Sequence, residues 1–401
     1  MRFPEAISLR LRTRDPPGPS VKAIIIGAGI GGLTAAIALQ KVGIDAHVFE
    51  RASELGEVGA GISLWSNATR VLEYLGLADA LRQHSITGIP SQVRASSGRV
   101  LSSISAAEMR EQGIAVGVLH REDLLSMLAA AVDSSRLHLN RPCAGFTDAA
   151  GQVTARFASG ESLSADVLIG ADGLNSQVRA QLFGSAPPRY SSYTAWRAVV
   201  DFALPELKAC ETWGRGRRFG IVPINQRRVY WYATQNAPEG QKDSPAALKQ
   251  DLLRLFRGWH APIEALLDAT PESAILRNDI YDRDPLSRWS EGRVTLLGDA
   301  AHPMTPNLGQ GACQAIEDAV VLASCLANSP DIPTGLRDYE TQRIPRTSQV
   351  VLASRRIGDF AQWENPLACG LRDLALRLTP RQVALRQMTA VVRYDAAAAS
   401  R

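Results

Sequence analysis

A loop in the second half of the chain carries residues whose types and spacing could bind a flat ring that accepts charge. An apolar run at residues 294–297 leads into the loop, and apolar residues recur at helical spacing over residues 312–322. Glycines let backbone amides approach a flat ligand, and the helix directs its partial positive charge at negative charge gathering there. An aspartate here could accept hydrogen bonds from ligand hydroxyls, although such an aspartate is more often only a turn residue. The residues that could bind are Gly298, Asp299, Gly309, Gly311 and Ala312.

The beginning of the chain has the pattern of a dinucleotide-binding unit. Residues 21–26 form an apolar strand, and the turn GAGIGG joins it to an amphipathic helix. The first glycine permits the tight turn, the second lets the backbone meet a pyrophosphate, and the last allows close helix packing. A second strand at residues 46–49 ends at Glu50 and Arg51, where the carboxylate would hold a ribose hydroxyl and disfavour the 2′-phosphate of NADP. The turn residues are Gly27, Gly29, Ile30, Gly31 and Gly32.

A third strand delivers an aspartate into a glycine turn. Residues 165–169 are apolar, and Asp172 and Gly173 follow them, with Asn175 or Ser176 as the expected cap of the next helix. Three strand ends that each combine glycine with an acid favour one nucleotide site over three unrelated turns.

Two further segments could complete that site. A glycine-rich loop at residues 54–67 is either a plain connection or a cover over a flavin ring, with clearance given by Gly59 and Gly61. Arg121 precedes a helix at residues 124–132, and it is either a solvated residue or a cation that reaches the pyrophosphate. These residues alone leave both choices open.

The composition bounds the class of protein. With 401 residues, 45% hydrophobic and 21% charged, the chain is expected to be a soluble globular protein of two or three domains. A net charge of +4 slightly favours binding of an anionic substrate, and it does not indicate nucleic-acid binding. The 5 cysteines are odd in number and never spaced CxxC, so we expect reduced thiols in the cytoplasm and no metal site. No apolar run is long enough for a membrane span.

The residue pattern changes after Pro187 and Pro188. Aromatic and β-branched runs with partial alternation then predict an antiparallel sheet, which a hairpin at residues 92–104 accompanies. We therefore predict an α/β fold, with a Rossmann-like nucleotide domain, an inserted mainly antiparallel β-sheet substrate domain and C-terminal helices. The expected parts are a flexible extension at 1–20, with a weak targeting peptide as the alternative, the nucleotide domain at 21–90, 105–187 and 284–365, the substrate domain at 91–104 and 188–283, and C-terminal helices and tail at 366–401.

Three motifs, in this order and spacing, resemble those of single-component (group A) FAD-dependent monooxygenases of the 4-hydroxybenzoate/salicylate hydroxylase family. They are GAGIGG with Glu50, GADGLNSQVR around Asp172, and GDAAHPMTPNLGQGACQAIEDA from Gly298. The sheet segments RRFGIVPI and RRVYWYA are most similar to FAD-dependent urate hydroxylases. One departure is Ser66, which stands where that family usually has a proline before the asparagine.

The resemblance implies an extended FAD, with Glu50 at the adenosine ribose, Arg121 by the pyrophosphate or ribityl chain, and Asp299 at the ribityl chain. The Asp172 motif would serve FAD and a transient NADH or NADPH. The nicotinamide would reduce the flavin, and O₂ would then form a C4a-hydroperoxide that hydroxylates an aromatic or heteroaromatic, anionic small molecule. The implied catalytic residues are Arg218 at the flavin or substrate, Tyr230 facing the substrate ring, and His302 and Pro306 in the flavin loop.

Several alternatives remain open at this stage. Arg197 could anchor the substrate in place of Arg218, although a surface position is the stronger expectation for it. A lone histidine beside a proline, as at His302, is more often structural than a proton shuttle. The enzyme could instead be an isoprenoid epoxidase, which a wholly apolar pocket would favour, a dehydrogenase or reductase that inserts no oxygen, or a flavoprotein that only binds. A homodimer is one expectation for its assembly.

Overall fold

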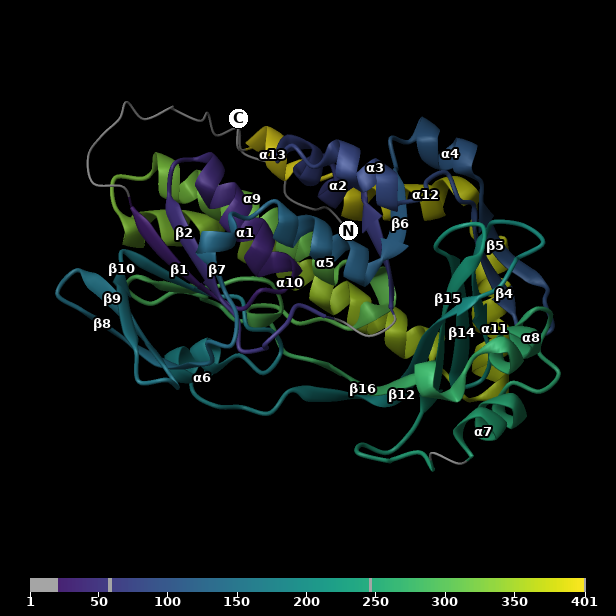
Figure 1. The fold of residues 1–401 in the computed structure, drawn as a ribbon. Helices are drawn as coiled ribbons and strands as arrows, with labels where there is room; N and C mark the ends of the chain where they lie inside the picture. Colours follow the sequence, from purple (N-terminus) through teal and green to yellow (C-terminus); the bar gives the residue numbers. More distant parts are fainter. Residues whose placement is uncertain (1–20, 57–59, 245–246, 400–401) are drawn as a thin grey trace.

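A parallel sheet and a larger antiparallel sheet lie at opposite ends of the molecule in the computed structural model, which describes residues 21–56, 60–244 and 247–399 (Figure 1). The extension expected at residues 1–20 and the clearance expected at Gly59 lie outside this described part. The strands are β1 (Lys22–Ile26), β2 (Asp45–Phe49), β3 (Gly61–Trp65), β4 (Ser91–Ala95), β5 (Val100–Ile104), β6 (Val116–His120), β7 (Leu137–His138), β8 (Cys143–Ala149), β9 (Gln152–Phe157), β10 (Ser162–Ala165), β11 (Val167–Gly170), β12 (Arg189–Asp201), β13 (Ala209–Trp213), β14 (Arg217–Pro223), β15 (Arg228–Asn236), β16 (Leu276–Asp282) and β17 (Val294–Leu296).

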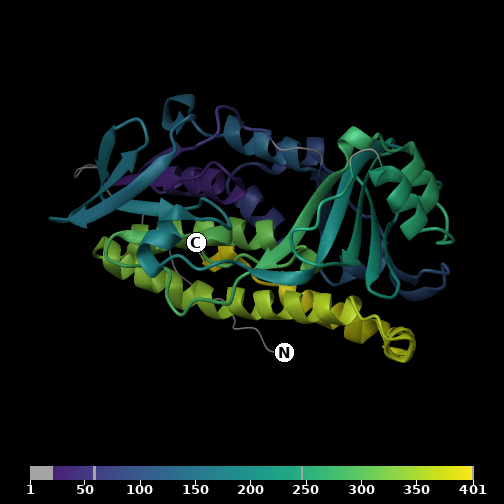
Figure 2. The same ribbon diagram turned by 90° about the horizontal axis from the view of Figure 1, so that it is seen from below.

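Helices cover the parallel sheet and continue into the C-terminal part of the chain. The helix α10 runs along most of the molecule and links its two ends (Figure 2). The helices are α1 (Ile30–Lys41), α2 (Ser66–Tyr74), α3 (Ala78–His84), α4 (Ala106–Glu111), α5 (Arg121–Ala130), α6 (Gln177–Phe183), α7 (Leu248–Leu255), α8 (Ile263–Ala269), α9 (Gly311–Asn328), α10 (Ile332–Ala361), α11 (Pro366–Leu378), α12 (Arg381–Val392) and α13 (Ala396–Ala399). The predicted mixed α/β fold with C-terminal helices is confirmed.

The parallel sheet aligns the three strand ends that the motifs predicted. Its order is β17-β11-β1-β2-β7, and nearly every residue of β1 and β11 is buried because the sheet is covered on both faces. Ile26 is in register with Phe49 on one side and with Gly170 on the other, and Gly170 is in register with Leu296. The loops that follow these four strands therefore leave the sheet side by side, at the edge where such sheets bind ligands.

The seven-stranded sheet has the order β16-β12-β15-β14-β13-β4-β5 and is antiparallel except between β4 and β13. In β15, Val229, Trp231 and Ala233 pack into a core with α7 and α8. Because successive side chains of a strand point to opposite faces, Tyr230 and Tyr232 face away from that core. This second face of the sheet is turned toward the nucleotide side of the molecule.

Several parts of the fold differ from the sequence expectation. The glycine-rich loop contains strand β3, which pairs with β6 in a short ribbon. A three-stranded sheet of β8, β9 and β10 was not predicted, and neither was helix α8. The strands β8 and β10 have several exposed residues and no clean apolar alternation, so the hydrophobic pattern gave little signal there.

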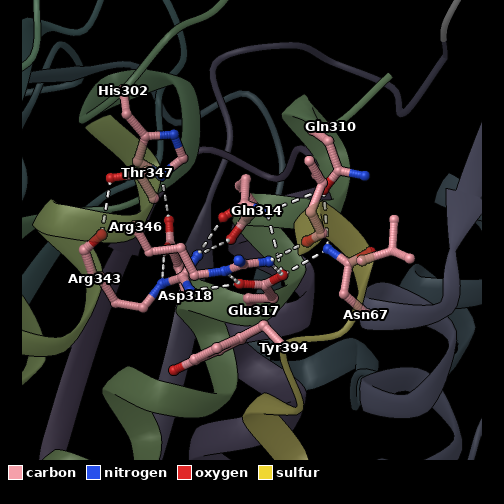
Figure 3. A network of polar contacts seen from close by, with 12 residues as sticks. Asn67, His302, Gln310, Gln314, Glu317, Asp318, Arg343, Arg346, Thr347 and Tyr394 are labelled. Carbon is pink, nitrogen blue, oxygen red and sulfur yellow. Dashed lines mark hydrogen bonds and ion pairs between the residues drawn. The ribbon is translucent and has the colours of Figure 1, made fainter. Parts of the chain in front are cut away.

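A buried cluster of charges joins α9 to α10 (Figure 3). Glu317 and Asp318 are adjacent on α9, and Arg343 reaches both, with Nη1 at 2.5 Å from Glu317 Oε2 and Nε at 2.6 Å from Asp318 Oδ1. Arg346 adds two hydrogen bonds of 2.7 Å to Glu317. Burial opposes ionisation of Asp318, but His302 and Arg343 outweigh it and hold its pKa at about 2. Two cations thus balance two carboxylates away from solvent.

The cluster also supports the binding loops. Asp318 Oδ2 accepts a hydrogen bond of 3.1 Å from the backbone N–H of Gly298, directly before Asp299. Asn67 donates to Glu317 at 2.5 Å and to the side chain of Gln310 at 3.0 Å, which lies at the start of α9. Hydrogen bonds to the same charged groups therefore fix both the loop after β17 and the first turn of α9.

We predict that Arg343→Met lowers the free energy of unfolding by roughly 3–5 kcal/mol, because two buried carboxylates lose their shared cation. Arg82→Met is the matched control, since Arg82 and its partner Asp79 are both exposed and such a pair contributes about 1 kcal/mol at most. Chemical denaturation of both variants measures the difference. Equal losses in the two variants would contradict a stabilising role for the cluster.

Candidate active site

A cavity of about 770 Å³ lies between the strand ends of the parallel sheet and the free face of the antiparallel sheet. Within the part of the chain that the structure describes, Gly32 and His302 are the two predicted cofactor-binding or catalytic residues that do not line it. Those that do are Gly27, Gly29, Ile30, Gly31, Glu50, Arg51, Gly61, Arg121, Asp172, Gly173, Arg218, Tyr230, Gly298, Asp299, Pro306, Gly309, Gly311 and Ala312. The fold thus brings segments from across the chain to one site.

The glycine turn after β1 has room on one side only. A Cβ added at Gly32 would lie 2.0 Å from the carbonyl oxygen of Gly27, so this glycine serves the packing of α1 against the turn. A Cβ at Gly29 would have no protein atom within 4 Å, because that position faces the cavity. The first turn of α1 has no side-chain cap, which leaves its N–H groups available to an anionic group such as a pyrophosphate.

Glu50 and Asp172 both lie on the cavity wall and are both fixed by backbone groups. The Glu50 carboxylate accepts hydrogen bonds of 2.8 Å from the N–H of Ala28 and 2.9 Å from that of Ala52. Asp172 accepts from the Ser176 hydroxyl at 2.5 Å and from the N–H of Gln177 at 2.7 Å, so it also holds the start of α6. Ser176, one of the two expected caps, is the N-cap of that helix.

The loop between β17 and α9 forms the wall next to the antiparallel sheet. Gly309 adopts a left-handed backbone conformation with φ of 59°, and α9 begins two residues later without a side-chain cap. Asp299 lines the cavity and is exposed there, and desolvation by the surrounding protein raises the pKa of its carboxyl group. The buried indole Nε1–H of Trp65 has no acceptor among the described residues. Uncapped amides, an open carboxylate and an orphaned donor fit a polar, flat cofactor such as FAD.

Gly61 lines the cavity and also has a packing role that the sequence did not suggest. Clearance for a flavin ring stays a prediction, and a Cβ at this position would lie 2.6 Å from the Cβ of Tyr230. The glycine therefore lets strand β3 approach the antiparallel sheet. Burial raises the pKa of Tyr230, although Arg197 and Arg121 act in the opposite direction. Tyr230 accordingly keeps its hydroxyl proton at neutral pH and can donate a hydrogen bond into the cavity.

Two arginines on the sheet side differ in their electrostatic surroundings. Arg218 is buried, donates to Gln362 Oε1 at 2.9 Å and pairs with Glu211 at 3.1 Å. Arg197 also lines the cavity, which corrects the expectation of a surface position. Within the described part of the chain, its Nε–H has no acceptor and no carboxylate forms an ion pair with it. Arg197 is thus a cation whose charge is not balanced by a partner.

His302 does not reach the cavity. Its Nε2 lies 2.6 Å from Asp318 Oδ2, and its ring packs on Trp289 at a centroid distance of 5.3 Å. The side chain is buried within the charge cluster, which agrees with the structural alternative rather than with a proton shuttle. Pro306, in the same loop, lies on the cavity wall.

Sequence reasoning missed several residues of the cavity wall. The missed residues Glu211, Tyr232 and Thr234 alternate with core residues along their strands. The register of the sheet brings them onto one face, which lines the cavity. Gln362 follows α10 and could not be assigned to the site, because it acts through Arg218 from a segment far away in the sequence.

The parallel sheet presents an edge suited to a nucleotide, and the antiparallel sheet closes the cavity over that edge. This arrangement is typical of FAD-binding oxidoreductases. Residues 20–354 match the family model described as FAD binding domain. An aurachin C monooxygenase/isomerase from Stigmatella aurantiaca is 45% identical over 358 residues, covering 88% of this chain and 93% of that protein. An FAD-dependent urate hydroxylase from Klebsiella pneumoniae is 36% identical over 349 residues, covering 85% and 90%.

Solved structures agree with these relatives. The crystal structure of Klebsiella pneumoniae HpxO complexed with FAD and uric acid matches with a TM-score of 0.88 and 32% sequence identity, covering 93% of this chain and 97% of that chain. The chain belongs to the FAD binding domain family, and it is an FAD-dependent monooxygenase. The resemblance predicted from the three motifs is confirmed.

We predict that two alanine substitutions in the GAGIGG turn affect different properties. Gly32→Ala should destabilise the apoprotein by about 1–3 kcal/mol or more, since its Cβ strikes the backbone. Gly29→Ala should leave the apoprotein as stable as the wild type and reduce FAD retention, because its Cβ enters only the cavity. Thermal unfolding and flavin absorbance measure the two properties. Full FAD retention by Gly29→Ala would exclude close contact of the cofactor at this position.

Asp299→Asn should lose FAD affinity while its apoprotein gains stability at neutral pH. A carboxyl group whose pKa is raised on folding disfavours the native state once it ionises. This penalty is absent below the ordinary aspartate pKa and grows as the pH rises through the native pKa. The two apoproteins should therefore unfold alike near pH 3 and differ at pH 7, in denaturation measured at both values. A less stable Asn variant at pH 7 would contradict this assignment.

Proposed function

We propose that the enzyme uses NADH or NADPH and O₂ to hydroxylate an anionic aromatic or heteroaromatic small molecule in this cavity. The observation that carries the proposal is the sheet-side wall, where aromatic rings and an unbalanced cation face the cofactor-binding edge. Support also comes from the relative named urate hydroxylase and from the similar structure that contains uric acid, a heteroaromatic compound. The nicotinamide would approach from the Asp172 side.

The side chains of this protein would supply binding and electrostatics. FAD, when bound, supplies the redox and oxygen-activating chemistry. The uncapped start of α9, at Gly311, would stabilise negative charge on the ring by its backbone amides, and Asp299 would accept hydrogen bonds from the ribityl hydroxyls. Tyr230 and the sheet behind it would exclude water from the space where the substrate reacts.

Arg197 is the group that we propose holds the anionic part of the substrate. Arg218 is already neutralised by Glu211, so a substrate anion would have to compete with that carboxylate. Arg197 has no such partner among the described residues, and it lies on the strand next to Tyr232, its register neighbour. An anion beside Arg197 would balance its charge while the ring packs against the tyrosines.

The cavity wall argues against one alternative function, and the other two differ from a hydroxylase in what they do with oxygen or with NADH and NADPH. An isoprenoid substrate would need an apolar cavity, but this one has two arginines, a glutamate and two tyrosines on its sheet side. A flavin dehydrogenase without oxygen insertion would transfer no oxygen atom from O₂ to its product. A flavoprotein that only binds would oxidise no NADH or NADPH with any ligand.

We also propose that the enzyme works in the cytoplasm, because all 5 cysteines carry free thiols. In the part of the chain that the structure describes, no helix is long and apolar enough to cross a membrane.

The proposal is tested by NADH and NADPH consumption against phenolic acids, urate, quinolines and polyenes. We expect at least one anionic ring compound to accelerate consumption and to gain one ¹⁸O atom under ¹⁸O₂, detected by mass spectrometry. Stimulated consumption with only H₂O₂ as the product would contradict a hydroxylase for that compound. Turnover of polyenes alone would favour the epoxidase.

Arg197→Met should raise KM for the anionic substrate by about tenfold or more, since a charge-assisted hydrogen bond is lost, with FAD content unchanged. A neutral analogue of the same ring serves as the control, and its KM should change little. Arg218→Met should instead lower the coupling of NAD(P)H use to product, because Glu211 is left without its cation. Steady-state kinetics with product analysis separates these effects. Equal loss for the anion and its neutral analogue would remove Arg197 from the anion site.

A further inference from the structure

The buried guanidinium of Arg218 is held by two groups besides its carboxylate partner Glu211. Tyr193, on β12, lies under it, with the Arg218 Cζ at 5.4 Å from the centre of the tyrosine ring. Gln362, directly after α10, accepts the Nε–H of Arg218 at 2.9 Å. Tyr193 is only 3% exposed and Gln362 is also buried, so both groups approach Arg218 from the protein interior. The position of this cation is therefore set by the protein before any substrate binds.

The hydroxyl of Tyr193 reaches the loop between β17 and α9, the cofactor loop. Burial raises the pKa of Tyr193, although Arg218 acts in the opposite direction, so the phenol keeps its proton at neutral pH. It donates a hydrogen bond to Asn307 Oδ1 at 3.4 Å. Asn307 lies on the cavity wall, next to Pro306. One tyrosine thus contacts both the buried cation of the substrate wall and the cofactor loop.

The end of α10 forms a second connection between the same two places. Ser354, Gly358 and Gln362 follow one another at intervals of four residues and therefore share one face of the helix. The Ser354 hydroxyl donates to the carbonyl oxygen of Thr305 at 2.6 Å. A Cβ at Gly358 would lie 2.3 Å from Asn307 Nδ2, so the cofactor loop packs directly on the helix. The helix face that contacts the loop is thus the face that carries Gln362.

We propose that Tyr193 is a positioning residue that fixes Arg218 relative to the cofactor loop, with Gln362 as a second support. Both connections begin at Asn307 and end at Arg218, since Asn307 also donates to the carbonyl oxygen of Ser354 at 3.0 Å. They form a closed ring of contacts, which resists distortion because a movement of Arg218 would stretch both connections at once. In an active site, a misplacement of about 1 Å can lower the rate about a hundredfold.

The link matters because oxygen transfer requires the flavin and the substrate to be aligned. Under the proposed function, on which this step rests, the substrate takes its place from the antiparallel sheet and the flavin takes its place from the cofactor loop. If the two could shift relative to each other, NAD(P)H and a proton would reduce O₂ to H₂O₂, and no oxygen atom would reach the substrate. The contacts of Tyr193 oppose that shift.

Tyr193→Phe tests the link in the FAD-loaded full chain, because it removes one hydroxyl and keeps the ring beneath Arg218. The fraction of NAD(P)H consumption that yields hydroxylated product should fall by roughly tenfold, with FAD content unchanged. Tyr190→Phe is the matched control, since Tyr190 is on the same strand and donates instead to the carbonyl oxygen of Ala237 at 2.7 Å. It should keep wild-type coupling. Wild-type coupling in Tyr193→Phe, or an equal loss in both variants, would overturn the proposal.

A double-mutant cycle tests whether Tyr193 acts through Arg218. In the Arg218→Met background, Tyr193→Phe should change the coupling by less than about twofold, because the group that it positions is gone. A fall as large as that caused by Tyr193→Phe alone would show that Tyr193 acts by another route, and it would overturn the positioning role.

Hydrogen exchange separates this inference from the proposed function, since it needs no substrate. FAD loading of the wild type should slow amide exchange at residues 305–310, and also at residues 214–220 around Arg218, by at least about threefold. Tyr193→Phe should keep the effect at the cofactor loop and lose at least about half of the effect around Arg218, whereas Tyr190→Phe should keep both. An undiminished effect around Arg218 in Tyr193→Phe, or no effect there in the wild type, would overturn the link. If the wild type hydroxylates none of the compounds tested, the proposed function fails and the exchange measurement alone decides this inference.

Discussion

The register of the parallel sheet is the constraint on which the site depends. Four strands end at the same level, so the backbone hydrogen bonds of β1, β2, β11 and β17 fix where their loops begin. A one-residue slip in any of these strands would move a loop along the edge and turn its side chains to the other face. Glu50, Asp172 and Asp299 can therefore share one ligand although they are far apart in the sequence.

The buried cluster between α9 and α10 extends this constraint from the backbone to the cofactor loop. Glu317 and Asp318 lie on the helix whose first turn faces the cavity, and Asp318 accepts from the N–H before Asp299. Arg343 ties both acids to α10, whose far end leads to Gln362 and the antiparallel sheet. A hydrophobic core of the same volume could be equally stable, but it would not fix polar backbone groups in one position. We attribute to the cluster a role in geometry as much as in stability.

The sequence predicted the cofactor half of the site better than the substrate half, and the reason is physical. Tight turns that meet a pyrophosphate or a flat ring need glycine and acid at fixed spacing, so their residues can be read from the chain. The substrate wall depends on which residues of four strands face each other, and Arg197 looked like a surface residue until the register placed it beside Tyr232. For His302 the sequence left two roles open, because its position next to the loop gave no sign of its buried partner Asp318.

The shape of the substrate wall depends on close packing of tyrosines against glycines. Tyr230 packs where a side chain at Gly61 would collide with it, and Tyr232 lies over Gly220, where a Cβ would approach its ring to 2.0 Å. Both tyrosines therefore lie close to backbone, which restricts their rotation. Replacing one strand residue on this face changes the shape or charge of the substrate wall while the parallel sheet stays the same. This separation explains how relatives with the same nucleotide motifs can act on different molecules, since the cofactor site is fixed by register and the substrate site by single side chains.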